Sequence, residues 1–123
     1  MLRNEKGFTL IEIIAVLVIL GILAAVAIPK YISMMDESRI SAAQGAIAEV
    51  KSRCSGYYAN QLLQGLTPSG ANVQTSVGAA PTLGSDFTVA TALNGSDTVI
   101  TVSVVKGVNL TANVVGTWFF PTT

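Results

Sequence analysis

One charged residue interrupts the most apolar part of this sequence. Glu12 lies within FTLIEIIAVLVILGILAAVAI, residues 8–28, which contains no other charged side chain. A carboxylate at the centre of a bilayer costs about 2.5–3.5 kcal/mol on insertion scales, and it costs less near the interface. Glu12 is therefore either a near-interface carboxylate that reaches toward water or one half of an ion pair. Because the run holds no Lys or Arg, the cation would come from another chain or from a newly formed amine.

Few other residues could perform chemistry. The sequence contains no histidine and one cysteine, Cys54, so an intramolecular disulfide and a multi-cysteine metal site are excluded. From residue 65 to residue 123, the charged residues are Asp86, Asp97 and Lys106. No catalytic constellation, cofactor or metal site is expected from this set, and a membrane-anchored enzyme is only a remote alternative. The net charge of zero gives no indication of nucleic-acid binding.

The apolar run has the length of a membrane-spanning helix. At about 1.5 Å per residue, residues 8–28 would extend roughly 31 Å, the thickness of a bilayer's hydrocarbon core. Arg3, Lys6 and the starting amine precede the run, so the positive-inside rule places the N-terminus in the cytoplasm. A secretory signal peptide would have a shorter apolar run and a small-residue cleavage site, whereas this run continues into Pro29. A plain anchor explains the length of the run but not Glu12.

Residues 6–31 resemble the N-terminus of type IV pilins and of the pseudopilins of type II secretion. Their sequence is KGFTLIEIIAVLVILGILAAVAIPKY. The resemblance rests on a basic leader followed by a set of fixed positions: Gly7, Phe8, Glu12 as the fifth residue from Phe8, Gly21 and Pro29. Beyond this segment only the general plan is similar, a long helix followed by a small Thr- and Gly-rich β region.

The resemblance implies how residues 1–12 would be used. A prepilin peptidase would remove the leader, residues 1–7, between Gly7 and Phe8 on the cytoplasmic side and methylate the new amine of Phe8. That amine would be the missing cation, and Glu12 would pair with the amine of a neighbouring identical subunit. Two unit charges about 4 Å apart attract by about 4 kcal/mol at an effective dielectric of 20. The other expected partner is an inner-membrane assembly platform.

The resemblance also implies two locations and one flexible segment. The chain would sit in the inner membrane as a single-pass protein before assembly and in an extracellular filament afterwards. Gly21 lowers helix propensity by about 1 kcal/mol, and Pro29 removes a backbone donor, so the stretch between them could unwind in the filament. The other interpretation is a close helix contact at Gly21 and a simple kink at Pro29.

The helix is expected to continue as an amphipathic helix over residues 29–64. Apolar and aromatic residues recur at steps of three and four, namely Ala43, Ile47, Val50, Cys54 and either Tyr57 or Tyr58. This spacing predicts one buried helix face with Cys54 as a small core residue. Gly65 is expected to end the helix. Charged residues at positions 36, 37 and 39 are expected on a solvated face, with ion pairing between subunits as the alternative.

The remaining chain predicts a small antiparallel sheet. Residues 65–86 are rich in Gly and Pro and are expected to form a connecting loop. Strands are expected within residues 87–123, at 87–93, 98–106 and 108–120, the last as one strand or as two divided at Gly116. Turns are expected at Asn94-Gly95 and Lys106-Gly107. The predicted fold class is α+β, a long N-terminal helix packed on a sheet of three to four strands.

Two functions within the same superfamily remain open. The first is a structural subunit of a type IV pilus. The second is the major pseudopilin of a type II secretion system, which the resemblance implies would bind calcium. Asp86 and Asp97 are the only side-chain carboxylates from residue 65 onward, which is few for a site that needs several oxygen ligands. The sequence also lacks the C-terminal cysteine pair of many pilins. Electron transport along stacked aromatics is a further hypothesis, for which an aromatic content of 7% gives no particular support.

Overall fold

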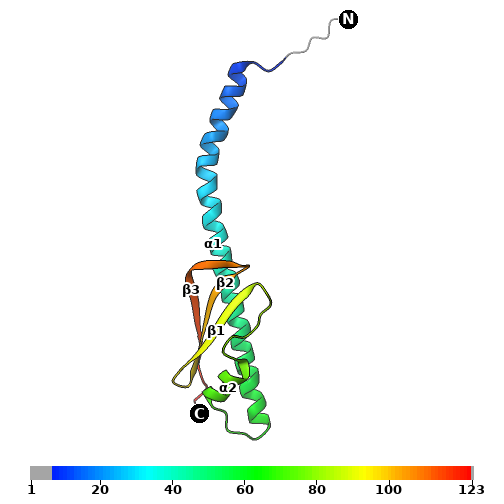
Figure 1. The fold of residues 1–123 in the computed structure, drawn as a ribbon, viewed down its shortest axis with the longest axis vertical. Coiled ribbons are helices and arrows are strands. Elements are labelled where there is room, and N and C mark those ends of the chain that lie inside the picture. Colours follow the sequence, from blue (N-terminus) through cyan, green and yellow to red (C-terminus); the bar gives the residue numbers. More distant parts are fainter. Residues whose placement is uncertain (1–6, 123) are drawn as a thin grey trace, which may run out of the picture. The chain divides into compact units, whose positions relative to one another are not determined.

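The computed structural model describes residues 7–122. Two helices precede three strands: α1 (Leu10–Leu63), α2 (Gly70–Val77), β1 (Phe87–Asn94), β2 (Asp97–Val105) and β3 (Val108–Trp118) (Figure 1). The chain divides at Met35 into two units, so that α1 contributes to both. The expected α+β fold with a long helix and an antiparallel sheet is confirmed. The leader, residues 1–7, lies outside the described residues except for Gly7.

The first unit consists of the N-terminal half of α1. Its large apolar side chains are exposed, from Leu10 at 79% to Met35 at 40%. By length and composition, α1 is the one helix among residues 7–122 that could cross a membrane. Gly21 and Pro29 both lie inside this continuous helix. No side chain or backbone atom approaches the position of a Cβ at Gly21 within 4 Å, so the chain itself makes no close contact there.

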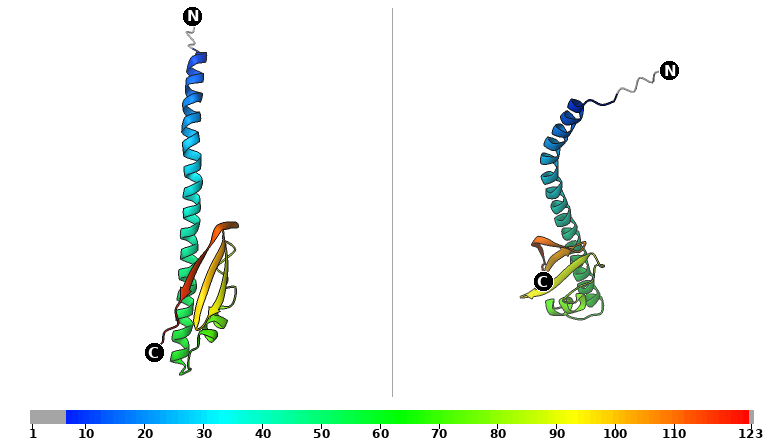
Figure 2. Two further views of the ribbon diagram at one scale, coloured as in Figure 1. Left: turned by 90° about the vertical axis from the view of Figure 1, so that its left-hand side faces the viewer. Right: turned by 45° about the horizontal axis from the view of Figure 1, so that its top comes forward.

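In the second unit, the C-terminal half of α1 packs on the sheet (Figure 2). Four of the residues predicted on the buried face are buried, and Ala46 joins them: Ala43, Ala46, Ile47, Val50 and Cys54. At the end of that face, Tyr58 is half-buried and Tyr57 is exposed. The helix ends as expected at Gly65, whose φ of 71° suits a glycine. The N–H of Leu66 donates to the carbonyl of Gln61, and the N–H of Gly65 donates to that of Leu62. This pair of bonds is a Schellman motif, which gives the helix end a fixed geometry.

The three strands form an antiparallel meander in the order β1-β2-β3. Gly95 (φ 67°) begins a two-residue turn between β1 and β2, and Lys106 (φ 51°) and Gly107 (φ 72°) form the turn between β2 and β3. Both are the tight turns that suit the twist of a hairpin. The residues that face α1 lie opposite one another in rows across the strands: Val89, Val102 and Val114, then Thr91, Ile100 and Gly116, then Thr98 and Trp118.

Gly116 lies where β3 packs against side chains of α1. A Cβ at this position would overlap Cγ2 of Ile47 and lie 3.4 Å from Cε of Lys51. Of the two alternatives for this segment, the single strand is observed, because β3 continues through Gly116 to Trp118. The glycine marks a close helix–sheet contact, which is the other common reason for glycine within a strand.

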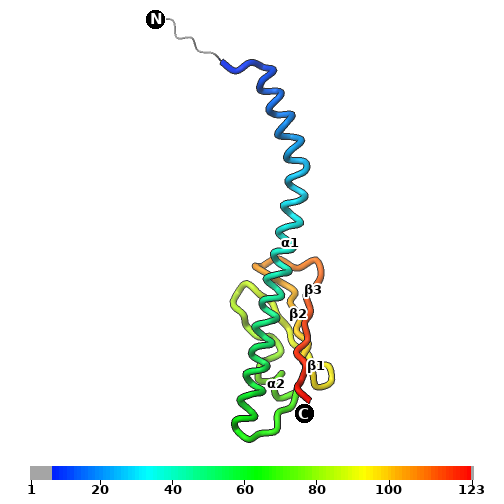
Figure 3. Tube along the Cα trace, turned by 180° about the vertical axis from the view of Figure 1, so that it is seen from behind, coloured from blue at the N-terminus to red at the C-terminus, as the bar shows by residue number. Residues whose placement is uncertain are grey.

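The segment expected as a loop contains a helix. Within residues 65–86, Ser69 caps α2 by accepting a hydrogen bond from the N–H of Asn72 at 3.2 Å. After α2 (Figure 3), the carbonyl of Ala79 accepts a 2.8 Å bond from the N–H of Thr91, so this segment is bonded to the outer edge of β1. The capping serine was the available signal, but the glycines and prolines around it favoured a loop.

Candidate functional site

The Gly7–Phe8 junction lies in non-helical chain just before α1. Both residues are exposed, and the side chain of Phe8 is 87% exposed. No atom lies within 4 Å of the Cβ position at Gly7. A peptide bond must enter a protease cleft in extended form, so a glycine in exposed, non-helical chain is a suitable position for cleavage.

Thr9 and Glu12 form a capping box at the start of α1. The N–H of Thr9 donates to Oε2 of Glu12 at 2.8 Å, and the N–H of Glu12 donates to Oγ1 of Thr9 at 3.3 Å. The carbonyl of Thr9 accepts a 3.3 Å bond from the N–H of Ile13. The spacing T-x-x-E is the sequence signature of this motif. That signal was present in the sequence but was missed, because Glu12 was considered only as a charge in an apolar run.

The capping box changes the interpretation of Glu12. Its carboxylate satisfies a backbone donor that would otherwise have no partner in an apolar environment, and it lies at the positive end of the helix dipole. Only Oε2 is used in this bond. Oε1 therefore remains available to a second donor, and cleavage before Phe8 would create an amine next to Thr9.

The charged residues near position 36 lie on an exposed face of α1, where two of them pair within the chain. Arg39 donates to Oδ1 of Asp36 at 2.8 Å, three residues apart on α1. An exposed pair of this kind contributes little to stability.

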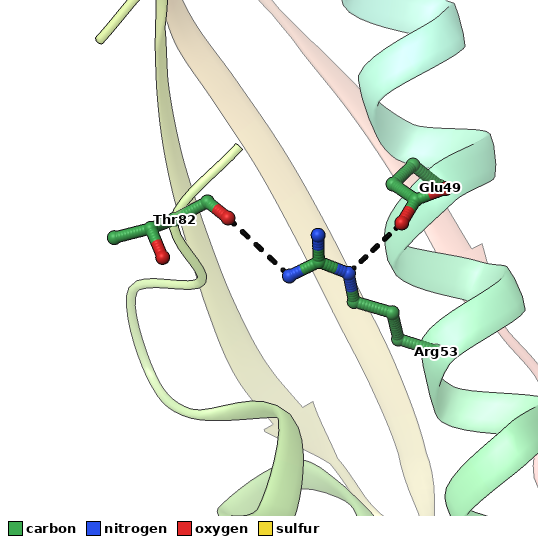
Figure 4. Close-up of polar contacts among 3 residues, drawn as sticks. All are labelled: Glu49, Arg53 and Thr82. Carbon is green, nitrogen blue, oxygen red and sulfur yellow. Dashed lines mark hydrogen bonds and ion pairs between the residues drawn. The ribbon is translucent and has the colours of Figure 1, made fainter. Parts of the chain in front are cut away.

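A second polar contact joins α1 to the segment that follows α2. The guanidinium of Arg53 donates to Oε1 of Glu49 at 3.0 Å and to the carbonyl of Thr82 at 3.3 Å (Figure 4). All three residues are exposed, so this contact positions the segment on the helix and resembles no catalytic arrangement.

The residues considered for chemistry in the second unit have structural roles. Burial raises the pKa of the Cys54 thiol, which opposes formation of the reactive thiolate. Asp97 accepts a 2.8 Å bond from the N–H of Phe120. Within residues 7–122, no group of three or more His, Cys, Asp or Glu side chains could hold a metal ion.

The aromatic residues near the C-terminus form a packed cluster. Tyr58, Trp118 and Phe120 meet edge to face with ring centroids 5.4–6.3 Å apart, and Trp118 donates to Oγ of Ser55 at 3.0 Å. Trp118 is buried, as expected for a core residue, whereas Phe119 is 73% exposed. The cluster closes the end of the core.

The features at the start of α1 fit a class of protein with an apolar N-terminal helix that is long enough to cross a membrane. Residues 2–28 match the family described as the prokaryotic N-terminal methylation motif. The chain is similar to members of the family of type IV pilins and type II secretion pseudopilins.

Relatives from both branches of this family match the chain. It is 48% identical over 48 residues to type II secretion system core protein G of Pseudomonas aeruginosa, covering 39% of this chain and 34% of the relative. It is 39% identical over 67 residues to the type IV major alpha-pilin of Moraxella bovis, covering 54% and 40%. It is 31% identical over 97 residues to a fimbrial protein of Pseudomonas aeruginosa, covering 77% and 56%. The matches thus span about a third to just over half of each relative. No solved structure matches the chain significantly.

Proposed function

We propose that this chain is the repeating structural subunit of a type IV pilus and not an enzyme. A prepilin peptidase cuts between Gly7 and Phe8 and methylates the new amine, and an inner-membrane platform assembles the subunits. The observation that carries the proposal is the start of α1. There an accessible Gly–Phe junction precedes an exposed apolar helix, and Glu12 completes the capping box of that helix. Relatives named as fimbrial proteins and pilins support it.

In this proposal the apolar half of α1 has two successive environments. It first spans the inner membrane with the N-terminus in the cytoplasm, and it then packs among the same helices of neighbouring subunits. Glu12 pairs with the amine of a neighbour's Phe8 through the oxygen that the capping box leaves free. Because an unpaired charge in apolar surroundings is penalised, the pair acts mainly as a register device. The stretch between Gly21 and Pro29 can unwind in the filament.

Two substitutions separate the charge of Glu12 from its capping role. Glu12→Gln keeps a side chain that can complete the capping box but removes the charge. Thr9→Val removes the capping hydroxyl and keeps the charge, at a cost of about 0.5–2 kcal/mol to the helix start. We expect Glu12→Gln to insert into membranes normally and to lose most filament yield, while Thr9→Val retains more of it. Normal filaments from Glu12→Gln would refute the pairing.

Mass spectrometry of purified filaments tests the processing step. The subunit should begin at Phe8 and carry one added methyl group. A filament subunit that still begins at Met1 would contradict cleavage at Gly7–Phe8.

The pseudopilin of type II secretion is the second candidate, and one observation favours it. The match to core protein G has a higher identity than the match to the Moraxella pilin, although it covers less of the chain. Deletion of the gene distinguishes the two. Loss of long surface filaments with normal protein secretion supports the pilin, whereas loss of secretion with filaments unchanged supports the pseudopilin.

A further inference from the structure

The C-terminal end of α1 carries an exposed apolar projection, here called the leucine end. Leu62, Leu63 and Leu66 are 52%, 90% and 56% exposed. The two bonds of the Schellman motif at Gly65 hold them in fixed backbone geometry. The projection is therefore ordered before it meets a partner, and ordering it on binding costs little entropy.

A pocket lies at the opposite end of the same unit, here called the bulge pocket. It has a volume of about 400 Å³ and lies between α1, at Asp36, Arg39 and Ile40, and residues 109–115 of β3. The pocket exists because β3 leaves its register with β2. Val102 pairs with Val114 and Val104 pairs with Asn109, so Ser103 alone faces residues 110–113.

The bulge pocket opens beside an unprotected edge of the sheet. The outer edge of β1 is bonded through Thr91 to Ala79, whereas in the described part of the chain the outer edge of β3 has no backbone partner. Ile40 and Val115, which line the pocket, are 43% and 57% exposed. Exposed apolar side chains beside a free strand edge are typical of an interaction surface.

The charges of the two surfaces suit each other. No charged residue occurs from residue 54 to residue 85, so the leucine end is neutral. In the bulge pocket, Asp36 and Arg39 neutralise each other at 2.8 Å. An apolar projection can therefore enter the pocket without leaving a charge unpaired, whereas a charged projection could not.

We propose that the leucine end of one copy docks into the bulge pocket of another copy along the filament. This inference rests on the proposed function, because subunits drawn from one membrane are parallel and must meet through unlike surfaces. Residues 36 and 63 are about 40 Å apart along α1, at about 1.5 Å per residue. A contact between opposite ends of a unit is heterologous, and it generates an open helical assembly when the rotation does not close a ring.

Cysteine cross-linking in filaments of the full chain tests the contact. The pair Leu63→Cys and Thr111→Cys places one thiol on the leucine end and one on the exposed bulge. The control pair, Leu63→Cys and Ala90→Cys, places the second thiol on the exposed face of β1. The native Cys54 is buried and contributes no background. A ladder of oligomers from the first pair, with at least about tenfold less from the control, supports the contact.

A pair of charged substitutions, one on each surface, tests the same contact independently of cross-linking. Leu63→Glu should reduce filament yield at least about tenfold, and adding Ile40→Lys should restore much of it by creating an ion pair across the contact. Ala90→Glu is the matched control and should assemble normally. This inference is overturned if Leu63→Glu forms filaments normally, or if filaments with Leu63→Cys and Thr111→Cys give no ladder of oligomers. Either result leaves the proposed function intact. Absence of filaments from the unmodified chain overturns the proposed function itself.

Discussion

The close contact between α1 and β3 predicts how the second unit responds to a single methyl group. In Gly116→Ala the new Cβ would overlap Cγ2 of Ile47, a residue that is only 6% exposed. Lys51 can move its flexible end away, but Ile47 cannot, because a β-branched side chain in a helix has one strongly preferred χ1 rotamer. The helix or the strand must therefore shift.

The expected cost follows from this geometry. Adding a methylene group to a well-packed core costs about 1–3 kcal/mol. With a urea m-value of about 1–3 kcal/mol/M, the unfolding midpoint of Gly116→Ala should fall by about 1 M. Gly45→Ala is the matched control, because nothing lies within 4 Å of its Cβ position on the helix surface. That substitution should stabilise the protein by up to about 1 kcal/mol.

A second substitution tests the named contact. Ile47→Leu moves the branch from Cβ to Cγ and so removes Cγ2 at nearly constant volume, which alone costs less than about 1.5 kcal/mol. It should restore stability in the Gly116→Ala background. Ile47→Val keeps both γ carbons and should not restore it.

Urea unfolding of the full chain in mild detergent measures these effects. Trp118 is the single tryptophan, and it is buried and bonded to Ser55, so its fluorescence reports the unfolding of this unit. The reasoning is refuted if Gly116→Ala is as stable as the unmodified chain, or if Ile47→Val rescues it as well as Ile47→Leu does.

Three further outcomes follow from the second unit. Gly70→Ala should destabilise it by at least about 1–3 kcal/mol in the same assay, because a Cβ there overlaps the backbone carbonyl of Ser96. Burial raises the pKa of the Cys54 thiol in the folded protein, so the thiol of the unfolded chain ionises at lower pH. The free energy of unfolding should therefore be constant below a pH of about 8.5 and fall as the pH rises above it. Cys54→Ala should remove this pH dependence. Asp97→Ala removes the acceptor for the N–H of Phe120 and should cost about 0.5–1.5 kcal/mol, with faster carboxypeptidase digestion as the readout.

Much of the fold could be predicted because its signals are local and periodic. The apolar run needed only its length, and the buried face of α1 followed from steps of three and four, with Cys54 correctly placed in the core. The hairpin turns followed from glycines that adopt positive φ. In each case the residues that carry the signal are neighbours in the sequence.

The features that were missed depend on contacts between distant segments or on a second role for one residue. Gly116 is a glycine because Ile47 lies against it, and nothing in the sequence near residue 116 reveals that. Helix α2 is short and gains support from Thr91, which accepts a bond from Gln74 and donates to Gly78. Glu12 was examined for its charge, and its capping role with Thr9 was overlooked although the spacing shows it.

In the described residues, the segment after β3 is held to the rest of the second unit by hydrogen bonds and ring packing. The hydroxyl of Ser55 bonds Trp118 at the end of β3, and the carboxylate of Asp97 bonds the N–H of Phe120 just after it. The ring of Phe120 also packs against those of Tyr58 and Trp118. None of these contacts requires an oxidant, and the sequence has only one cysteine. Maturation of this unit should therefore proceed equally well with and without oxygen, and independently of enzymes that form disulfides. Reducing agents that open disulfide-closed domains should leave this one folded.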